Sequence, residues 1–76
     1  MHLSLSDLNV GEQARVAGYA HDSAYAGQLM RLGLIPGTAL EVRRVAPLGD
    51  PVEIRFRGFS LALRPREAAC LLLERA

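Results

Sequence analysis

The fold is decided by residues 52–63, which read VEIRFRGFSLAL. Apolar and polar side chains alternate on both sides of Arg57-Gly58, and a spacing of two residues places the apolar side chains of a strand on one face. A two-residue connection that contains glycine is typical of a tight β-hairpin turn. The segment therefore predicts a hairpin of two strands, 52–56 and 59–63, with Gly58 as a structural residue of the turn.

Two further strands are predicted before the hairpin. Residues 38–46 alternate as a strand until residues 43–45, where the apolar side chains change face. A β-bulge produces such a change, and bulges let a small sheet bend into a barrel. Residues 13–20 indicate the first strand, although Ala17 and Gly18 blur its alternation.

A helix is predicted between these two strands, over residues 22–32. Asp22 and Ser23 are candidate N-caps, and Gly33 can adopt the left-handed conformation that ends many helices. Side chains at positions i, i+4 and i+7 share one helical face, which we expect to be buried. That face holds Tyr25, Leu29 and Leu32, so Leu29, Leu32 and Gly33 are the predicted structural residues.

The remaining segments complete a small barrel. Residues 35–38 (IPGT) predict a type II turn, with proline at its second position and glycine at its third. Residues 64–68 predict one helical turn that begins at Pro65, and residues 69–74 predict a last strand that is apolar on both faces. The predicted class is mainly β: a strongly bent barrel of about five strands, with an α-helix inserted between the first and second strands and a short helical turn before the last strand.

Length and composition bound the function. The chain has 76 residues, which predicts a single domain, 1–76, with little room for a deep catalytic cleft. Half of the residues are hydrophobic and the net charge is +1, which disfavours both disorder and a strongly basic nucleic-acid-binding face. The longest apolar stretch is six residues, whereas a transmembrane helix needs about 20, and no targeting signal is evident. We therefore expect a cytoplasmic protein that meets a membrane only through a partner.

Few residues offer chemistry. His2, His21 and Asp22 are weak candidate metal ligands, because a zinc site takes three or four ligands held by supporting contacts. We expect these side chains to be exposed and any bound divalent metal to be incidental. Cys70 lies among apolar residues and is expected to be a buried, unreactive thiol. The sequence contains no nucleophile elbow, no paired carboxylates and no phosphate-binding glycine loop, so we expect no catalytic residue, no cofactor and no GTP binding.

Apolar residues near the end of the predicted helix offer a contact surface instead. Met30, Leu34 and Ile35 fall off the predicted buried stripe, and Pro36 and Gly37 form the turn that follows. An exposed apolar patch often marks a partner site. Periodicity does not place loop residues, so two alternatives stay open: these five residues bind a partner, or the mouth of the barrel covers them.

Several short motifs follow one another along the chain. The most specific is residues 29–38, LMRLGLIPGT, and residues 46–51 read APLGDP. The other matching positions are Leu5, Leu8, Gly11, Ala14, Leu40, Val42, Gly58, the segment 61–64 (LALR), Glu67 and Ala68. In this order and spacing, the motifs resemble the ferrous iron transport protein A (FeoA) family over nearly the whole chain. The resemblance implies an SH3-like barrel.

The same resemblance implies a function through protein–protein contact. FeoA family members act with FeoB, the membrane transporter of ferrous iron, which carries a cytoplasmic GTP-binding domain. The chain is thus expected to be an accessory or regulatory protein of bacterial ferrous iron uptake, recruited to the inner face of the membrane. The helix 22–32 and the turn 33–37 are expected to form its surface for FeoB.

Other functions stay open. A small RNA- or ribosome-binding barrel would use the arginines at positions 43, 44, 55, 57, 64 and 66, but Glu41, Glu53 and Glu67 lie between them and no aromatic ring accompanies them. We therefore expect no nucleic-acid partner. The resemblance also extends to the C-terminal domain of iron-dependent repressors, which leaves an Fe²⁺-sensing or chaperone domain as an alternative. An exposed strand edge or apolar patch would also allow a homo-oligomer.

Overall fold

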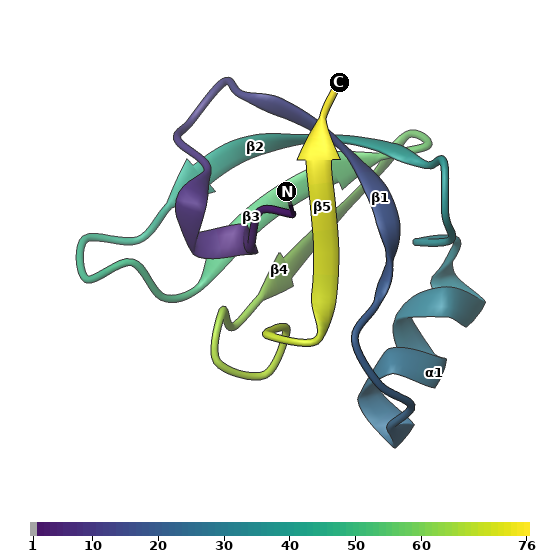
Figure 1. Cartoon of the computed structure of the whole chain (residues 1–76). Helices are drawn as coiled ribbons and strands as arrows, with labels where there is room; N and C mark the ends of the chain where they lie inside the picture. The colour runs from purple at the N-terminus through teal and green to yellow at the C-terminus, as the bar shows by residue number, and fades with distance from the viewer. Residues whose placement is uncertain (1) are drawn as a thin grey trace.

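The structure is a computed structural model and describes residues 2–76. Its strands are β1 (Gln13–Tyr19), β2 (Ala39–Val45), β3 (Val52–Phe56), β4 (Phe59–Leu63) and β5 (Leu71–Arg75). They form one antiparallel sheet in the order β4-β3-β2-β1-β5, which is strongly bent (Figure 1). The helix α1 (Ala24–Leu32) lies between β1 and β2 in the chain, and a short 3₁₀ helix, η1 (Leu5–Asp7), precedes β1. The predicted mainly β architecture with one inserted helix is confirmed.

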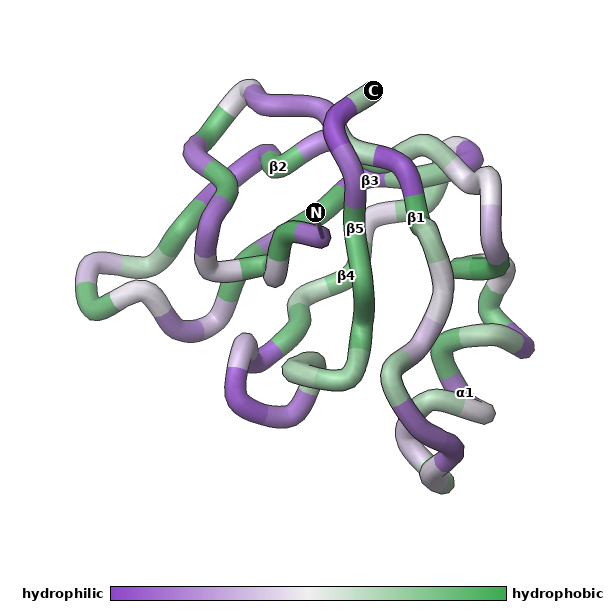
Figure 2. The backbone as a smooth tube through the Cα atoms, viewed as in Figure 1, coloured by the Kyte–Doolittle hydropathy of each residue, from purple (hydrophilic) through white to green (hydrophobic). Residues whose placement is uncertain are grey.

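The hydrophobic core lies on the concave side of the bent sheet. Each strand contributes its inward-facing side chains, and η1, α1, the segment before β5 and the single residues Leu8 and Leu34 supply the rest. Figure 2 shows the result as alternating hydrophobic and hydrophilic segments along the sheet, with a longer hydrophobic run in β5. Fully buried side chains include Leu5, Val16, Leu29, Leu34, Val42, Ile54, Leu71 and Leu73. In the described part of the chain, no helix is long and apolar enough to cross a bilayer.

The predicted hairpin forms as expected. β3 and β4 pair from Val52 opposite Leu63 to Phe56 opposite Phe59. The two turn residues, Arg57 and Gly58, have φ angles of 52° and 82°. Positive φ at both positions characterises the type I′ turn, whose twist matches that of the flanking strands. Gly58 adopts this conformation without strain, whereas Arg57 does so against its own preference.

Two bulges bend the sheet. The strand register shifts between Val42 and Arg44, where the sequence predicts a bulge, so that prediction is confirmed. A second shift lies in β1 between Val16 and Gly18, where the alternation of the sequence is blurred. Each bulge increases the local twist of its strand. Together they bring the two ends of the sheet round the core.

The helix begins two residues later than predicted. Ser23 is the N-cap, because its Oγ accepts the backbone N–H of Ala26 at 3.0 Å. Asp22 therefore lies outside the helix. The predicted C-terminal glycine is confirmed, since Gly33 has a φ of 110° and donates its N–H to the carbonyl of Met30 at 3.0 Å.

The residue after Gly33 corrects the predicted buried stripe. The N–H of Leu34 donates to the carbonyl of Leu29 at 3.0 Å, which together with the Gly33 bond makes a Schellman motif. This motif turns the residue after the glycine back onto the last helical turn, so Leu34 packs with Leu29 in the core and is 0% exposed. Leu32, by contrast, is 52% exposed. The prediction that Leu32 is buried is therefore wrong, and of the two alternatives left open for Leu34 the structure shows burial.

Two side chains hold the segment that follows the helix. The hydroxyl of Tyr19 donates to the carbonyl of Leu34 at 2.6 Å, and Oγ1 of Thr38 donates to the carbonyl of Gly33 at 2.8 Å. The N–H of Thr38 donates to the carbonyl of Ile35 at 2.9 Å and closes the predicted turn. The segment 33–38 is therefore closed on itself and fixed to β1 at both ends, since Gly37 and Thr38 also exchange backbone hydrogen bonds of 2.8 and 2.9 Å with Val16.

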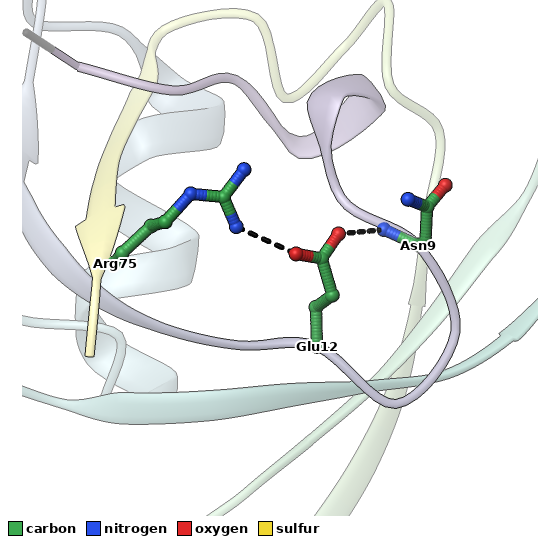
Figure 3. Close-up of polar contacts among 3 residues, drawn as sticks. All are labelled: Asn9, Glu12 and Arg75. Carbon is green, nitrogen blue, oxygen red and sulfur yellow. Dashed lines mark hydrogen bonds and ion pairs between the residues drawn. The ribbon is translucent and has the colours of Figure 1, made fainter.

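The two ends of the described chain are joined through β5. Leu3 and Leu73 exchange backbone hydrogen bonds of 2.7 and 2.9 Å. The carboxylate of Glu12 accepts the backbone N–H of Asn9 at 2.7 Å and Nη1 of Arg75 at 2.6 Å (Figure 3). The Asn9 bond, and then the Arg75 bond, lower the pKa of Glu12. The Arg75 contact links the residue before β1 to the end of β5, and the Asn9 bond holds the same carboxylate in place.

The Schellman motif predicts unequal effects of two leucines in the same stretch. Leu34→Ala is expected to lower the free energy of unfolding by about 2–5 kcal/mol, because it opens a cavity in the core. Leu32→Ala is expected to change it by less than about 0.5 kcal/mol, since its side chain is half exposed. Urea unfolding followed by circular dichroism measures both. Equal losses, or a larger loss at Leu32, would contradict the packing described here.

The Tyr19 hydrogen bond predicts an alkaline loss of stability. Burial, followed by the charges of Cys70 and Tyr25, raises the pKa of Tyr19 from 10.0 to about 12. Because the raised pKa belongs to the folded state, the stabilisation is complete below pH 10 and is lost as the pH rises towards 12. Tyr19→Phe is expected to lower the free energy of unfolding by about 0.5–1.5 kcal/mol at pH 7. Between pH 10 and pH 12 the free energy of unfolding should fall more steeply for the unmodified protein than for Tyr19→Phe. An equal fall in the two proteins would refute the role given to the Tyr19 hydroxyl.

Candidate interaction surface

Exposed apolar side chains gather where the end of α1 approaches the β3–β4 turn. Leu32 of α1 and Phe59 of β4, the latter 63% exposed, line one groove of about 140 Å³. Phe56, Ser60 and Leu61 complete its walls, and these five residues are called the apolar groove below. Ile35, 43% exposed, lies in an adjacent hollow with Arg57 and residues 36–39.

Contact between Gly33 and Arg57 joins the groove and the hollow into one surface. A Cβ atom at position 33 would lie 3.3 Å from Cδ of Arg57 and 3.8 Å from Cε2 of Phe56. The hairpin turn therefore packs directly on the glycine that ends α1, and the two segments lie on the same side of the barrel (Figure 1). The absence of a side chain at Gly33 permits this approach as well as the helix end.

The predicted partner-binding residues divide into two groups. Met30, Ile35, Pro36 and Gly37 are exposed, which makes them available for contact. Leu34 is buried beneath them and is corrected to a core residue. Whether the exposed group binds a partner stays a prediction.

Sequence reasoning missed two exposed apolar residues of this surface. The helical periodicity places Leu32 on the buried face. The one sequence signal against this is a glycine followed by leucine, the pattern of a Schellman motif, in which the residue after the glycine packs back on the helix. Phe59 points to the same face of β4 as the buried Leu63. It pairs with Phe56 at the end of the hairpin, where the ring centroids are 6.4 Å apart, and it stays 63% exposed. No sequence signal distinguishes this position from the buried position of Leu63 further along β4.

The candidate metal ligands do not form a cluster. His2, His21 and Asp22 are exposed, and residues 2–76 contain no group of three histidine, cysteine or carboxylate side chains placed to hold a metal ion. His21 lines a hollow of about 420 Å³ with Tyr25, Glu67 and Cys70. In this hollow, burial and then the charge of Glu67 raise the pKa of the Tyr25 hydroxyl. That any metal bound by these residues is incidental stays a prediction.

Cys70 is buried, as the sequence predicts. Its side chain is only 4% exposed, and its carbonyl accepts the N–H of Ala20 at 2.8 Å. The residue is thus held by the β1–β5 pairing, in which a small apolar side chain is suited to the available space.

The arginines are partly paired on the surface. Arg43 lies 3.7 Å from Glu41, and Arg64 lies 3.5 Å from Asp50. Both pairs are exposed and contribute little to stability. Within residues 2–76, Arg57 belongs to no ion pair, so the interaction surface carries a free cation beside its apolar side chains.

Solved structures share this fold. FeoA from Chlorobium tepidum is 40% identical with a TM-score of 0.86, over 96% of this chain and 70% of that chain. FeoA from Stenotrophomonas maltophilia, solved with zinc and described as an SH3 domain protein, is 26% identical with a TM-score of 0.83, over 95% of this chain and 89% of that chain.

Sequence comparison also finds FeoA proteins as relatives. A curated relative from Porphyromonas gingivalis, a fusion of Fe(2+) transport protein A with the Fe(2+) transporter FeoB, is 29% identical over 72 residues. These residues are 95% of this chain but only 8% of that relative. The model of the FeoA domain matches residues 3–75. The chain therefore belongs to the FeoA domain family and has its SH3-like fold.

Proposed function

We propose that this protein is a cytoplasmic accessory protein of bacterial ferrous iron uptake that binds FeoB and performs no chemistry of its own. The observation that carries the proposal is the exposed apolar surface at the end of α1, in a domain whose other large apolar side chains are mostly buried. Exposed apolar patches of this kind mark contact surfaces on small proteins.

The relatives support FeoB as the partner. In the Porphyromonas gingivalis relative, an FeoA sequence and an FeoB sequence form one polypeptide. Joining two domains raises their effective concentration for each other, which is useful where the two interact. The Stenotrophomonas maltophilia protein is described as a candidate activating factor of ferrous iron transport.

In this proposal the contact is made by Met30, Ile35 and the turn at Pro36-Gly37, extended by Leu32 and Phe59. Each of these residues is exposed, so the contact needs no rearrangement of the core. Because Tyr19 and Thr38 fix the segment 33–38, little conformational entropy is lost when the partner binds.

The test is a titration of this protein against full-length FeoB of the same organism in lipid nanodiscs, with and without GTP and Fe²⁺. Ile35→Asp and Met30→Asp are each expected to weaken binding about tenfold or more, because they place a charge in an apolar contact. Far-UV circular dichroism and thermal unfolding must show that both variants remain folded.

Leu48→Asp is the matched control. Leu48 is 96% exposed in the β2–β3 loop, far from α1 in Figure 1, and the change is chemically the same. Its affinity for FeoB should stay within about twofold of the unmodified protein. Equal weakening by all three variants would mean that the contact is not located at α1, and a failure of the unmodified protein to bind would refute the proposed function.

A further inference from the structure

β4 is an edge strand of the sheet. It pairs with β3 on one side, and the strand order ends there. In a hairpin with a two-residue turn, Phe56 and Phe59 exchange both backbone hydrogen bonds, so every second residue of β4 is bonded to β3. The backbone N–H and C=O groups of Ser60 and Ala62 therefore point away from β3. Within residues 2–76 neither residue has a backbone partner on that outer side.

The apolar groove lies along this free edge. Phe59, Ser60 and Leu61 of β4 line it together with Phe56 of β3 and Leu32 of α1. A strand added beside β4 would place every second side chain on the face of the sheet that carries Phe59 and Leu61. The groove of about 140 Å³ has room for one apolar side chain of such a strand.

Cations lie at both ends of the edge. Residues 57–66 read RGFSLALRPR, so Arg57 precedes β4, and Arg64 and Arg66 follow it. Arg64 is 3.5 Å from Asp50 in an exposed pair, whereas Arg57 and Arg66 belong to no ion pair in the described part of the chain. The edge is therefore apolar along its middle and positive at its ends.

This charge pattern disfavours a second copy of the chain as the occupant. In a symmetric antiparallel pairing of two β4 edges, Ser60 of one copy faces Ala62 of the other. Arg57 of the first copy then faces Pro65 of the second, between Arg64 and Arg66. Like charges placed across neighbouring strands are destabilising. An extended segment with acidic residues at its ends meets no such repulsion and would pair with the same arginines.

We propose that an extended segment of the partner adds to β4 as a further strand, with an apolar side chain in the apolar groove and aspartate or glutamate near both ends. Main-chain hydrogen bonds to Ser60 and Ala62 align the partner's segment with β4. The apolar groove and the arginines then select which side chains that segment carries. The source of the segment, FeoB, rests on the function proposed above.

Hydrogen exchange in the complex with full-length FeoB tests the strand directly. The amides of Ser60 and Ala62 face solvent in the free protein and are expected to exchange at least about tenfold more slowly in the complex. The amide of Leu61, already bonded to β3, is expected to change little. Mass spectrometry with fragmentation to single residues reads this alternation, which contact through side chains alone would not produce.

Two substitutions test the same geometry through affinity. Ala62→Pro removes the outward N–H while the β3 hydrogen bonds stay intact, and proline is tolerated on edge strands. It is expected to weaken FeoB binding about tenfold or more, whereas Ala62→Val, which keeps the N–H, should bind within about twofold. Arg57→Asn removes one end cation at a position where a type I′ turn favours asparagine, so this variant should fold well, bind FeoB more weakly and show less dependence on salt.

The outcomes separate this inference from the proposed function. Binding to FeoB with unchanged exchange at Ser60 and Ala62 overturns the added strand and leaves the function standing. Protection of these two amides that grows with the concentration of the protein alone assigns the edge to a second copy and overturns the inference. No binding to FeoB overturns both. If Ala62→Pro does not fold, the exchange measurement on the unmodified protein decides.

Discussion

The rest of the structure depends on the burial of Leu34. Its N–H completes the helix end, its side chain packs in the core with Leu29, and its carbonyl accepts the hydroxyl of Tyr19. One residue thus fixes a helix, a turn and the first strand relative to one another. Because Leu34 lies inside, its neighbours Leu32 and Ile35 remain outside, and the interaction surface is a direct result of this packing.

Sequence patterns predicted the elements that are set by local chemistry. The hairpin at residues 52–63, the bulge near Arg44 and the glycine that ends the helix all follow from alternation or from φ angles that few residues tolerate. The family could be recognised for the same reason, since its motifs are mostly turn residues and their apolar neighbours. Such signals are carried by adjacent residues, so they can be read without knowing the tertiary structure.

The candidate site was predicted less well, because exposure is decided by tertiary packing. Helical periodicity predicts that Leu32 shares the buried face of Leu29. In the structure the helix ends at Leu32, and Leu34 takes the buried place beside Leu29. Phe59 and Leu63 point to the same face of β4, yet only Leu63 is buried, and Phe59 lies on the edge strand opposite the buried Phe56. Neither difference is present in the local sequence. The arrangement of Arg57 over Gly33 also needed the structure, because it joins segments that are 24 residues apart.

The pairing of β5 with β1 also orders the events of folding. The β3–β4 hairpin and α1 are made from neighbouring residues and can form as soon as those residues leave the ribosome. The barrel closes only when residues 71–75 reach β1 and Leu73 reaches Leu3, contacts that span almost the whole chain. Contacts of such long range slow folding, because the intervening chain must be ordered before they form. The nascent chain therefore exposes its core face until residues 71–75 have been synthesised, and β5 is the element that ends this exposure.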